Sequence, residues 1–389
     1  MNALIFVAGL IFVIATVTGV LFVLVLPRRP MGIERLSLVV NNTVRLVFVV
    51  ASRLAKSYEG KDKILAPTAP VALLTQLLTW AAGLTMGFAM MLVPTTHSIW
   101  LGLTQALTSL FSVGALHVGG ESNTGIDIAA GATWVVIVAL QIAYLPSLYS
   151  SFSRREGLVT LLEGRAGSPA WGPELLARHQ LVGITDTLPD LYLQWEEWAA
   201  EVTESHTTYP VLLLFRSPEP WLSWTIGLLA VLDAGAMQLA LCPESAPSQA
   251  RLCLRMGFTL MNRIAGSLGW DIDPDPSPEG PIQLRFEEFS EAVDMLASYG
   301  FVMERTAQDA WPDFRGWRVN YERVAYRLAD RLTAPPAPWS GGRRHLRSGP
   351  EAPHRPPHRS PGTTEVIQSS RPQVVNTSGH RPMRRRWSS

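Results

Sequence analysis

Residues 71–152 decide the fold, and they fall into three parts: VALLTQLLTWAAGLTMGFAMMLV (71–93), PTTHSIWLGLTQALTSLFSVG (94–114) and, after a loop, IAAGATWVVIVALQIAYLPSL (128–148). The first and third parts carry no charge, and each reaches the ~20 apolar residues that a helix needs to cross a bilayer. We therefore expect two membrane-spanning helices here, with Gln76 and Gln141 among the few polar groups inside them.

The middle part is too short for a crossing of its own. Pro94 ends the first span, and residues 99–111 follow with helical periodicity, apolar on one side and rich in Thr, Ser and Gln on the other. About 13 residues cannot span the bilayer, and the pattern stops at Ser112-Val113-Gly114. A helix that enters the membrane without leaving it must return as extended chain, which is tolerated only where it is buried in protein or lines water. We predict a re-entrant helix.

The N-terminal residues 3–26 form another uncharged run of spanning length. They lack the basic start, the short apolar core and the small-residue cleavage site of a signal peptide. We expect an uncleaved membrane anchor. With only 17% charged and 47% hydrophobic residues, the composition agrees with a membrane protein.

The distribution of Lys and Arg predicts the orientation of these three spans. The loop at 27–68 carries eight basic residues, the segment 94–127 carries none, and Arg154 and Arg155 closely follow the last span. The positive-inside rule then places the N-terminus outside, and the 27–68 loop and everything after the third span in the cytoplasm. We expect a multi-pass protein of the cell membrane.

Two further apolar segments carry charges inside them. Residues 36–54 include Arg45 and Arg53, which suits a helix lying in the membrane interface better than another crossing. Residues 223–241 contain Asp233 at their centre, where a charge costs about 3 kcal/mol on insertion scales. We expect a buried core helix of a soluble domain there, with a further crossing as the alternative.

The chain after the third span predicts a soluble, mainly helical domain at residues 153–333. Apolar residues recur at helical spacing through much of it, and residues 211–215 are the one candidate for a short buried strand. From residue 334 the composition changes to Pro, Arg, Ser and His, with ten arginines against two glutamates. Such a segment cannot bury enough apolar surface to fold.

We therefore expect a disordered basic tail at residues 334–389. Because the membrane is close by, anionic lipid is the partner that its terminal arginines suit best. A plain solubilising role is the alternative, and a nucleic-acid partner is not expected.

No constellation of residues predicts catalysis or a metal site. The order Glu204-Ser205-His206 has the wrong spacing for a carboxylate-bridged metal site. The loop that opens at Asp271 fails the calcium-binding pattern because Pro276 stands where glycine is required. The chain has no phosphate-binding glycine loop and no dinucleotide fingerprint. We expect neither an enzyme nor a cofactor.

The order of span, short helix, Ser112-Val113-Gly114 and span resembles the pore module of the potassium channel superfamily, which has two transmembrane helices and one pore loop. The resemblance covers residues 71–152, about a fifth of the chain. In that family the filter reads TVGYG, and its backbone carbonyls replace the hydration shell of the ion. Ala115 stands where the family has tyrosine, and Leu116 stands where it has the second glycine, so the filter is non-standard.

The resemblance implies roles for six residues. Ser112, Val113 and Gly114 would line the ion filter, and Pro146 would bend the last span as a gate hinge. Glu121 and Asp127, the acids on the expected outer side, would form rings of negative charge at the pore mouth. For Pro146, the alternative is a proline that simply ends the span.

These observations together predict an all-α membrane protein. Its expected parts are an anchor (1–26), a basic interfacial loop (27–68), a pore-like module (69–152), a cytoplasmic helical domain (153–333) and a disordered tail (334–389). The predicted function is a cation channel of potassium type that conducts monovalent cations as a tetramer, because one chain supplies only a quarter of such a pore. The alternative is a non-conducting membrane scaffold or sensor that signals through its cytoplasmic domain.

Overall fold

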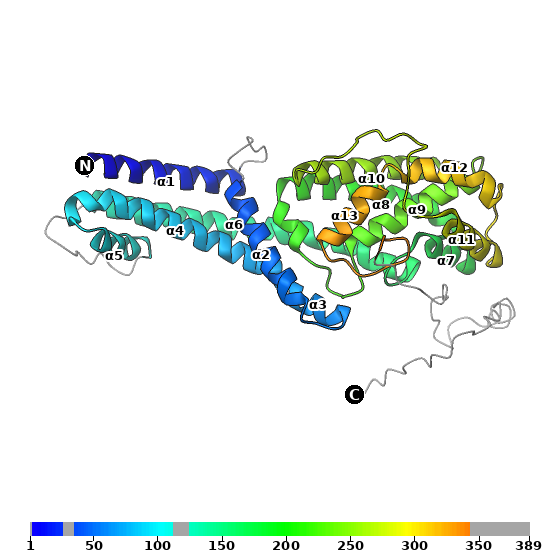
Figure 1. The fold of residues 1–389 in the computed structure, drawn as a ribbon, viewed down its shortest axis with the longest axis horizontal. Helices are drawn as coiled ribbons and strands as arrows, with labels where there is room; N and C mark the ends of the chain where they lie inside the picture. The colour runs from blue at the N-terminus through cyan, green and yellow to red at the C-terminus, as the bar shows by residue number, and fades with distance from the viewer. Residues whose placement is uncertain (1, 26–34, 112–123, 343–389) are drawn as a thin grey trace, which may run out of the picture.

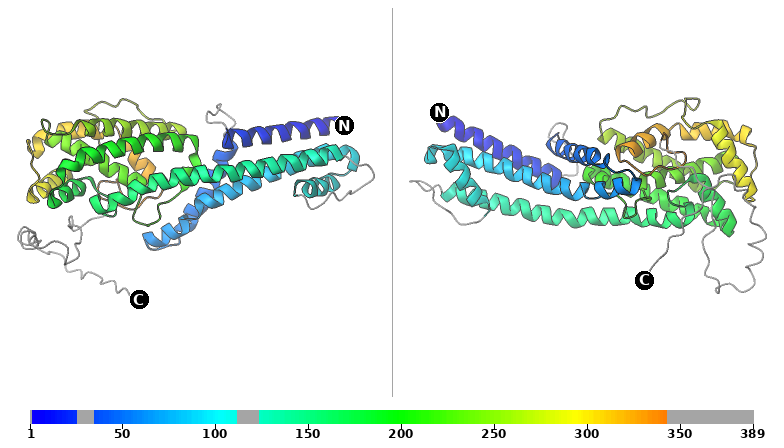
Figure 2. Two further views of the ribbon diagram at one scale, coloured as in Figure 1. Left: turned by 180° about the vertical axis from the view of Figure 1, so that it is seen from behind. Right: turned by 60° about the horizontal axis from the view of Figure 1, so that its bottom comes forward.

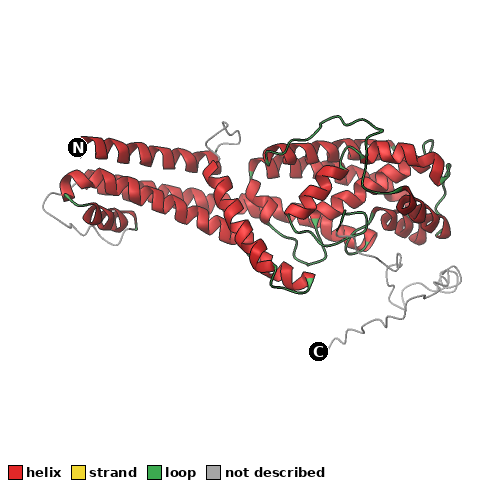
Figure 3. Cartoon of the chain, in the orientation of Figure 1, coloured by secondary structure: helices red, strands yellow, loops and turns green. Residues whose placement is uncertain are grey.

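The computed structural model describes residues 2–25, 35–111 and 124–342, and within these ranges every regular element is a helix (Figure 3). The predicted all-α class is confirmed for this part of the chain. The elements are α1 (Asn2–Leu24), α2 (Arg35–Ser52), α3 (Tyr58–Leu65), α4 (Thr68–Thr96), α5 (Ile99–Leu110), α6 (Thr124–Ala166), α7 (Gly172–Val182), η1 (Thr185–Thr187), α8 (Leu188–Thr208), η2 (Pro210–Leu214), α9 (Trp224–Leu241), α10 (Ser248–Ser267), α11 (Phe286–Ser298), α12 (Ala307–Arg318) and α13 (Glu322–Arg331).

The molecule has two halves joined end to end (Figures 1 and 2). We call α1, α4, α5 and the first part of α6 the membrane half, because α1, α4 and α6 run side by side as long apolar helices. The helical domain consists of the end of α6 together with α7 to α13. Between the halves, α2 and α3 form a junction on the side where α1 ends and α4 begins.

Four helical segments in the described residues are long and apolar enough to cross a membrane: Asn2–Leu24, Tyr58–Thr96, Thr124–Ala166 and Trp224–Leu241. They differ sharply in their surroundings. In the most apolar window of each of the first three, 17%, 44% and 22% of the residues are buried, against 94% in α9. This set of helices is typical of a multi-pass membrane protein, and α9 is the exception because protein surrounds it.

Small residues bring α1, α4 and α5 together in the membrane half. A Cβ added to Gly9 would lie 2.6 Å from the carbonyl oxygen of Gly87, so α1 and α4 approach until their backbones touch. Val13 packs over Gly87 in the same way. Because lipid tails are as apolar as the side chains, such close packing is what holds helices together in a bilayer.

Helix α6 extends far beyond the predicted span. Its 43 residues continue through the exposed Pro146 and past Arg155 as one helix, about 65 Å long at 1.5 Å per residue. Pro146 therefore does not end the helix, and whether the membrane span ends there stays a prediction. Its role as a gate hinge concerns a second conformation and stays a prediction.

Helix α9 is the centre of the helical domain. It packs against α7, α8, α10, α12 and α13, and its Asp233 is 1% exposed. The carboxylate of Asp233 accepts hydrogen bonds from the fully buried Arg318 guanidinium of α12 and from Tyr321 Oη at 2.7 Å. Arg318 also bonds Glu322 at 2.9 Å and the carbonyl oxygen of Trp339 at 2.8 Å. Burial raises the pKa of Asp233 to about 6, although Arg318 and Tyr321 favour its carboxylate form.

Two segments differ from what their composition suggests. The short strand considered for residues 211–215 is wrong, because Pro210–Leu214 form the 3-10 helix η2, and no described strand is present to pair with an extended segment. Residues 334–342, which follow the change in composition, pack on the helical domain. Trp339 is 3% exposed there and contacts Trp171 edge to face at 5.7 Å.

Candidate functional site

The short helix α5 returns toward the interior of the membrane half. The chain reverses at His97, whose backbone is left-handed (φ 51°), and Thr96 Oγ1 donates hydrogen bonds to the carbonyl oxygens of Leu92 and Ser98 at 3.0 Å. Helix α5 then runs back along α4 and ends at Leu110 (Figure 1). Its 12 residues cover about 18 Å, which is less than the ~30 Å hydrocarbon core.

Two glycines show how deeply α5 returns between the long helices. A Cβ on Gly102 would lie 2.8 Å from the carbonyl oxygen of Ala89, seven residues before the end of α4. A Cβ on Gly131 of α6 would lie 3.1 Å from the carbonyl oxygen of Ser109. Gly131 is seven residues into α6, so the far end of α5 sits about 10 Å along that helix.

A partly buried polar brace holds the far end of α5 against α6. The carboxylate of Asp127 accepts hydrogen bonds from Gln105 Nε2, at 2.9 and 3.2 Å, and from Ser109 Oγ at 2.7 Å. Gln105 is 5% exposed. The polar face of residues 99–111 indicates such an interaction from sequence, but its partner does not follow from the pattern. Asp127 was predicted at the pore mouth, and the structure adds that its carboxylate is engaged with α5.

Four of the predicted site residues, Ser112, Val113, Gly114 and Glu121, lie outside the described residues. The structure therefore describes only the chain on either side of these residues, which is the end of α5 and the helix α6. Phe111 contacts Trp134 of α6 edge to face at 5.3 Å, and Leu110 is fully buried. The segment that contains the predicted filter therefore connects the packed end of α5 to α6.

A second polar feature lies at the end of the membrane half that adjoins α2 and η2. Gln76 of α4 and Gln141 of α6 are 5% and 7% exposed, and both line a cavity of about 20 Å³, which has room for one water molecule. Neither amide atom of Gln76 has a hydrogen-bond partner in the described residues, and the same holds for Gln141 Oε1. Pro210 and Val211 of η2 line the cavity from the helical domain. Buried polar groups of this kind in spans are costly and mark pathways for water or ions.

Arg155 ties α6 to the helical domain, and the sequence does not reveal this role. The guanidinium is buried, bonds Glu156 at 2.7 Å and donates to the carbonyl oxygens of Leu212 and Phe215 at 3.0 and 2.8 Å. The only sequence signal is its position on the stripe of buried α6 residues that includes Leu148 and Val159. Its neighbour Arg154 stays exposed.

His206 completes this arginine cluster from α8. Arg155 Nη1 lies 3.0 Å from His206 Nε2, and because an arginine can only donate, the histidine accepts at Nε2 and carries its proton on Nδ1. Burial, and then the charge of Arg155, lower the pKa of His206 well below its usual value. The imidazole is therefore neutral in the folded protein.

The helical domain presents no constellation of a metal or catalytic site in the residues that the structure describes. No group of three metal-ligating side chains occurs there. Cys242 and Cys253 are both buried and unpaired, and burial raises the pKa of the Cys242 thiol to about 11. The Asp233 and Arg318 cluster has no exposed member, so it serves the core rather than a substrate.

No protein-family model, curated protein or solved structure matches this chain. The resemblance to potassium channels therefore rests on the residues quoted above.

Proposed function

We propose that the chain forms a cation-conducting pore of the re-entrant-loop type, with each of four copies supplying α4, α5 and α6. The observation that carries this proposal is α5, a helix too short to cross the bilayer that is held beside two long apolar helices by the Asp127 brace. A chain that stops at membrane depth needs either protein or water around its irregular backbone. A water-filled axis between copies supplies that environment.

The proposal includes three crossings, α1, α4 and α6, with the N-terminus outside and the helical domain in the cytoplasm. Helix α9 is excluded from this set because 94% of its apolar window is buried in protein, where lipid cannot reach it. Moving α9 into a bilayer would also separate Asp233 from Arg318. Large apolar side chains exposed on α4 and α6 are then available to lipid or to neighbouring copies; they include Leu74, Leu78, Val135, Val136 and Ile142.

A second candidate, a non-conducting membrane sensor, is favoured by one observation. Helix α6 passes without interruption from the membrane half into the helical domain, where Arg155 fixes it. A rigid connection of this kind transmits movement in either direction, whether or not ions pass.

The test is cation flux through purified protein in liposomes, with potassium and sodium compared. We expect flux from the wild type and at least an approximately tenfold loss in Gly114→Asp, which puts a charge in the predicted filter. Gly157→Asp is the matched control, because a Cβ on the exposed Gly157, far along α6 from the predicted pore mouth, meets nothing within 4 Å, and its flux should equal the wild type.

Native mass spectrometry of the same preparation gives the number of copies. Four copies with flux that Gly114→Asp abolishes would support the channel. A monomer or dimer, or equal flux in both variants, would contradict a pore of this design. Absence of flux over a range of pH and of both voltages would leave the sensor as the better proposal.

A further inference from the structure

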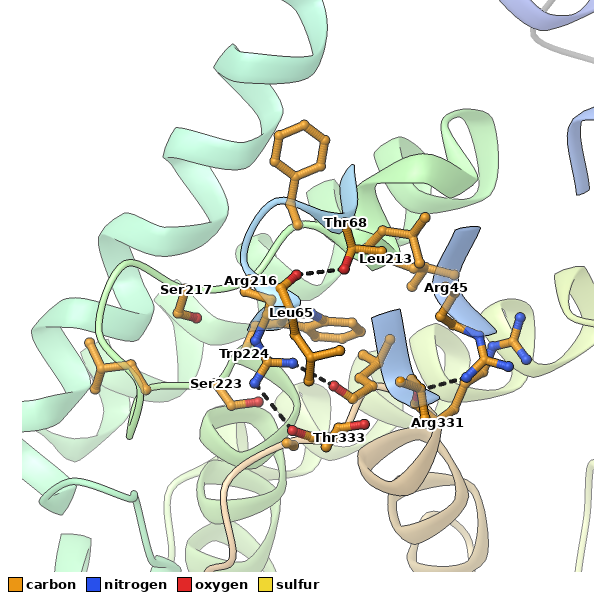
Figure 4. Close-up of a pocket in the computed structure, with 16 residues that line it drawn as sticks. Arg45, Leu65, Thr68, Leu213, Arg216, Ser217, Ser223, Trp224, Arg331 and Thr333 are labelled. Atoms are coloured by element: carbon orange, nitrogen blue, oxygen red, sulfur yellow. Dashed lines mark hydrogen bonds between the residues drawn. The ribbon is translucent and has the colours of Figure 1, made fainter. Parts of the chain in front are cut away.

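A positively charged recess lies at the junction of the two halves, where α2, α13 and the segment before α9 meet (Figure 4). Its open volume is about 40 Å³. Three arginines line it, from parts of the chain that are far apart in sequence: Arg45 on α2, Arg216 after η2, and Arg331 at the end of α13. Ser217 lines the same recess.

Only one of the three arginines has a carboxylate partner. Arg216 bonds Asp62 of α3 at 2.5 Å, the carbonyl oxygen of Leu332 at 2.7 Å and Tyr58 Oη at 2.7 Å. Arg45 and Arg331 take part in no ion pair within the described part of the chain. Within the described residues, the recess therefore holds two arginines that form no ion pair with an acid.

The two remaining arginines lie close together. Arg45 Nη1 donates to the carbonyl oxygen of Arg331 at 3.4 Å, and Arg331 Nη2 donates to Asn42 Oδ1 at 2.7 Å. Both are half-buried, and burial lowers the pKa of each guanidinium. The positive charge of Arg45 lowers the pKa of Arg331 further. Bringing two like charges together in partly buried surroundings is unfavourable unless an anion joins them.

Two polar atoms of the recess are buried without a hydrogen-bond partner in the described residues. They are Arg45 Nε, which can only donate, and Ser217 Oγ. Leaving such groups unpaired in a buried position is unfavourable. Ser217 lies across the recess from the two arginines (Figure 4). An anion beside Arg45 and Arg331 would accept a hydrogen bond from Arg45 Nε and neutralise the charges of both arginines.

We propose that Arg45 and Arg331 bind the phosphate group of an anionic phospholipid at the cytoplasmic surface of the membrane. Guanidinium groups pair with phosphate through parallel hydrogen bonds. The recess has room for a phosphate group. Beside Arg45 on α2, the apolar side chains of Leu46, Val47 and Val50 are 50–61% exposed, which is the setting that acyl chains require.

The proposal has a structural consequence that does not depend on conduction. A phosphate between Arg45 and Arg331 would link α2, which packs on the membrane half through Val40 and Val44, to the last helix of the helical domain. Lipid composition would then set how firmly the two halves are joined. Neither Arg45 nor Arg331 belongs to the predicted basic tail, which begins at residue 334.

The test uses the full-length protein in detergent, with lipid retention measured by native mass spectrometry after addition of phosphatidylglycerol or phosphatidylcholine. We expect the double variant Arg45→Gln/Arg331→Gln to retain phosphatidylglycerol about tenfold less than the wild type. Arg53→Gln, an exposed arginine just after α2, is the matched control and should retain it normally. Arg45→Lys/Arg331→Lys keeps both charges and should recover part of the binding.

A second measurement separates lipid from a soluble phosphate source. Inorganic phosphate at millimolar concentration is tested for its effect on the midpoint of thermal unfolding, with circular dichroism to show that each variant is folded. Protection by phosphate that the double variant loses, without retention of phosphatidylglycerol, would support a phosphate site and refute the lipid as its source. Equal retention in the wild type and the folded double variant would overturn the proposal.

Discussion

The two halves of this molecule contain helices of similar hydropathy that are held in different ways. In the membrane half, the segment Tyr58–Thr96, which includes α4, has a mean hydropathy of 1.6, and 44% of its apolar window is buried. In the helical domain, α9 has a mean hydropathy of 1.5 and 94% of its window is buried. Hydropathy alone therefore does not separate a membrane span from a core helix, and the burial of each helix does.

The difference extends to the groups that make the contacts. Close-packed glycines such as Gly9 and Gly87 join α1 to α4, and no side-chain ion pair in the described residues connects the long helices of the membrane half. In the helical domain, α9 is fixed by the buried pair of Asp233 and Arg318. The long helices of the membrane half are therefore held together by close packing at small residues, whereas the helical domain is also held together by buried ion pairs.

The largest decrease in the free energy of unfolding is expected when Arg318, which forms an ion pair with Asp233 of α9, is replaced. Arg318→Ala leaves Asp233 and Glu322 buried without their cation, and breaking a buried pair in this way costs about 3–5 kcal/mol. Denaturant unfolding followed by tryptophan fluorescence measures the loss. The control is Arg305→Ala, whose partner Asp313 is 54% exposed, and there we expect a loss of at most about 1 kcal/mol.

Equal losses in these two variants would contradict a special role for the buried charges of α9. They would also weaken the contrast between the halves, because α9 would then be held by apolar packing alone.

A smaller effect is expected from enlarging a glycine in the membrane half. Gly9→Leu drives a side chain into the backbone of α4, an overpacking that costs about 1–3 kcal/mol. Gly19→Leu is the matched control on α1, because a Cβ there meets nothing within 4 Å. The readout is a disulfide between Thr16→Cys and Gly83→Cys, since a Cβ on Gly83 would lie 3.7 Å from that of Thr16, within the ~3.5–4.5 Å that disulfides require.

Oxidation in liposomes followed by peptide mapping gives the yield of this disulfide. We expect Gly9→Leu to lower the yield severalfold and Gly19→Leu to leave it unchanged. A high yield in both would show that α1 does not need the close approach at Gly9.

The smallest effect is a pH dependence of stability that arises at His206, beside Arg155. The pKa of His206 is lowered in the folded protein, whereas the unfolded chain takes up a proton near pH 6.5. As the pH falls below about 6.5, only the unfolded chain is protonated at this site, so the free energy of unfolding decreases, by up to about 1.4 kcal/mol per pH unit. His206→Gln removes this contribution, and denaturant unfolding at pH 7 and pH 5 compares the two proteins.

The titration of Asp233 changes the free energy of unfolding with pH in the opposite direction. The contribution of His206 is therefore isolated by comparing the wild type with His206→Gln. The pKa of Asp233 is raised to about 6, so its contribution to stability is present below its unfolded pKa of about 3.9 and is lost as the pH rises through 6. That contribution is common to the wild type and His206→Gln and cancels in the difference. His97→Asn, at an exposed position in the turn before α5, is the control. The same pH dependence in the wild type and His206→Gln would contradict the assignment to His206.

Much of the fold follows from local patterns. The apolar runs predict α1, α4 and the first part of α6, and the short periodic segment after Pro94 predicts α5 within one residue at its start and end. Asp233 correctly indicates that the segment around it is a helix packed in protein. The positions of Ser112, Val113 and Gly114 as a filter remain predictions, because they lie outside the described residues.

The sequence by itself determined which segments are helical and which are apolar enough for a membrane, because helical periodicity and hydropathy depend on neighbouring residues. Only the tertiary structure decided which polar groups meet: Asp127 with Ser109, Arg155 with His206, and Arg318 with Asp233, which is 85 residues away. An arginine in the sequence looks the same whether it is exposed, as Arg154 is, or buried, as Arg155 is. Its role depends on residues far away in the sequence that bury it, and the local sequence pattern does not indicate which residues these are.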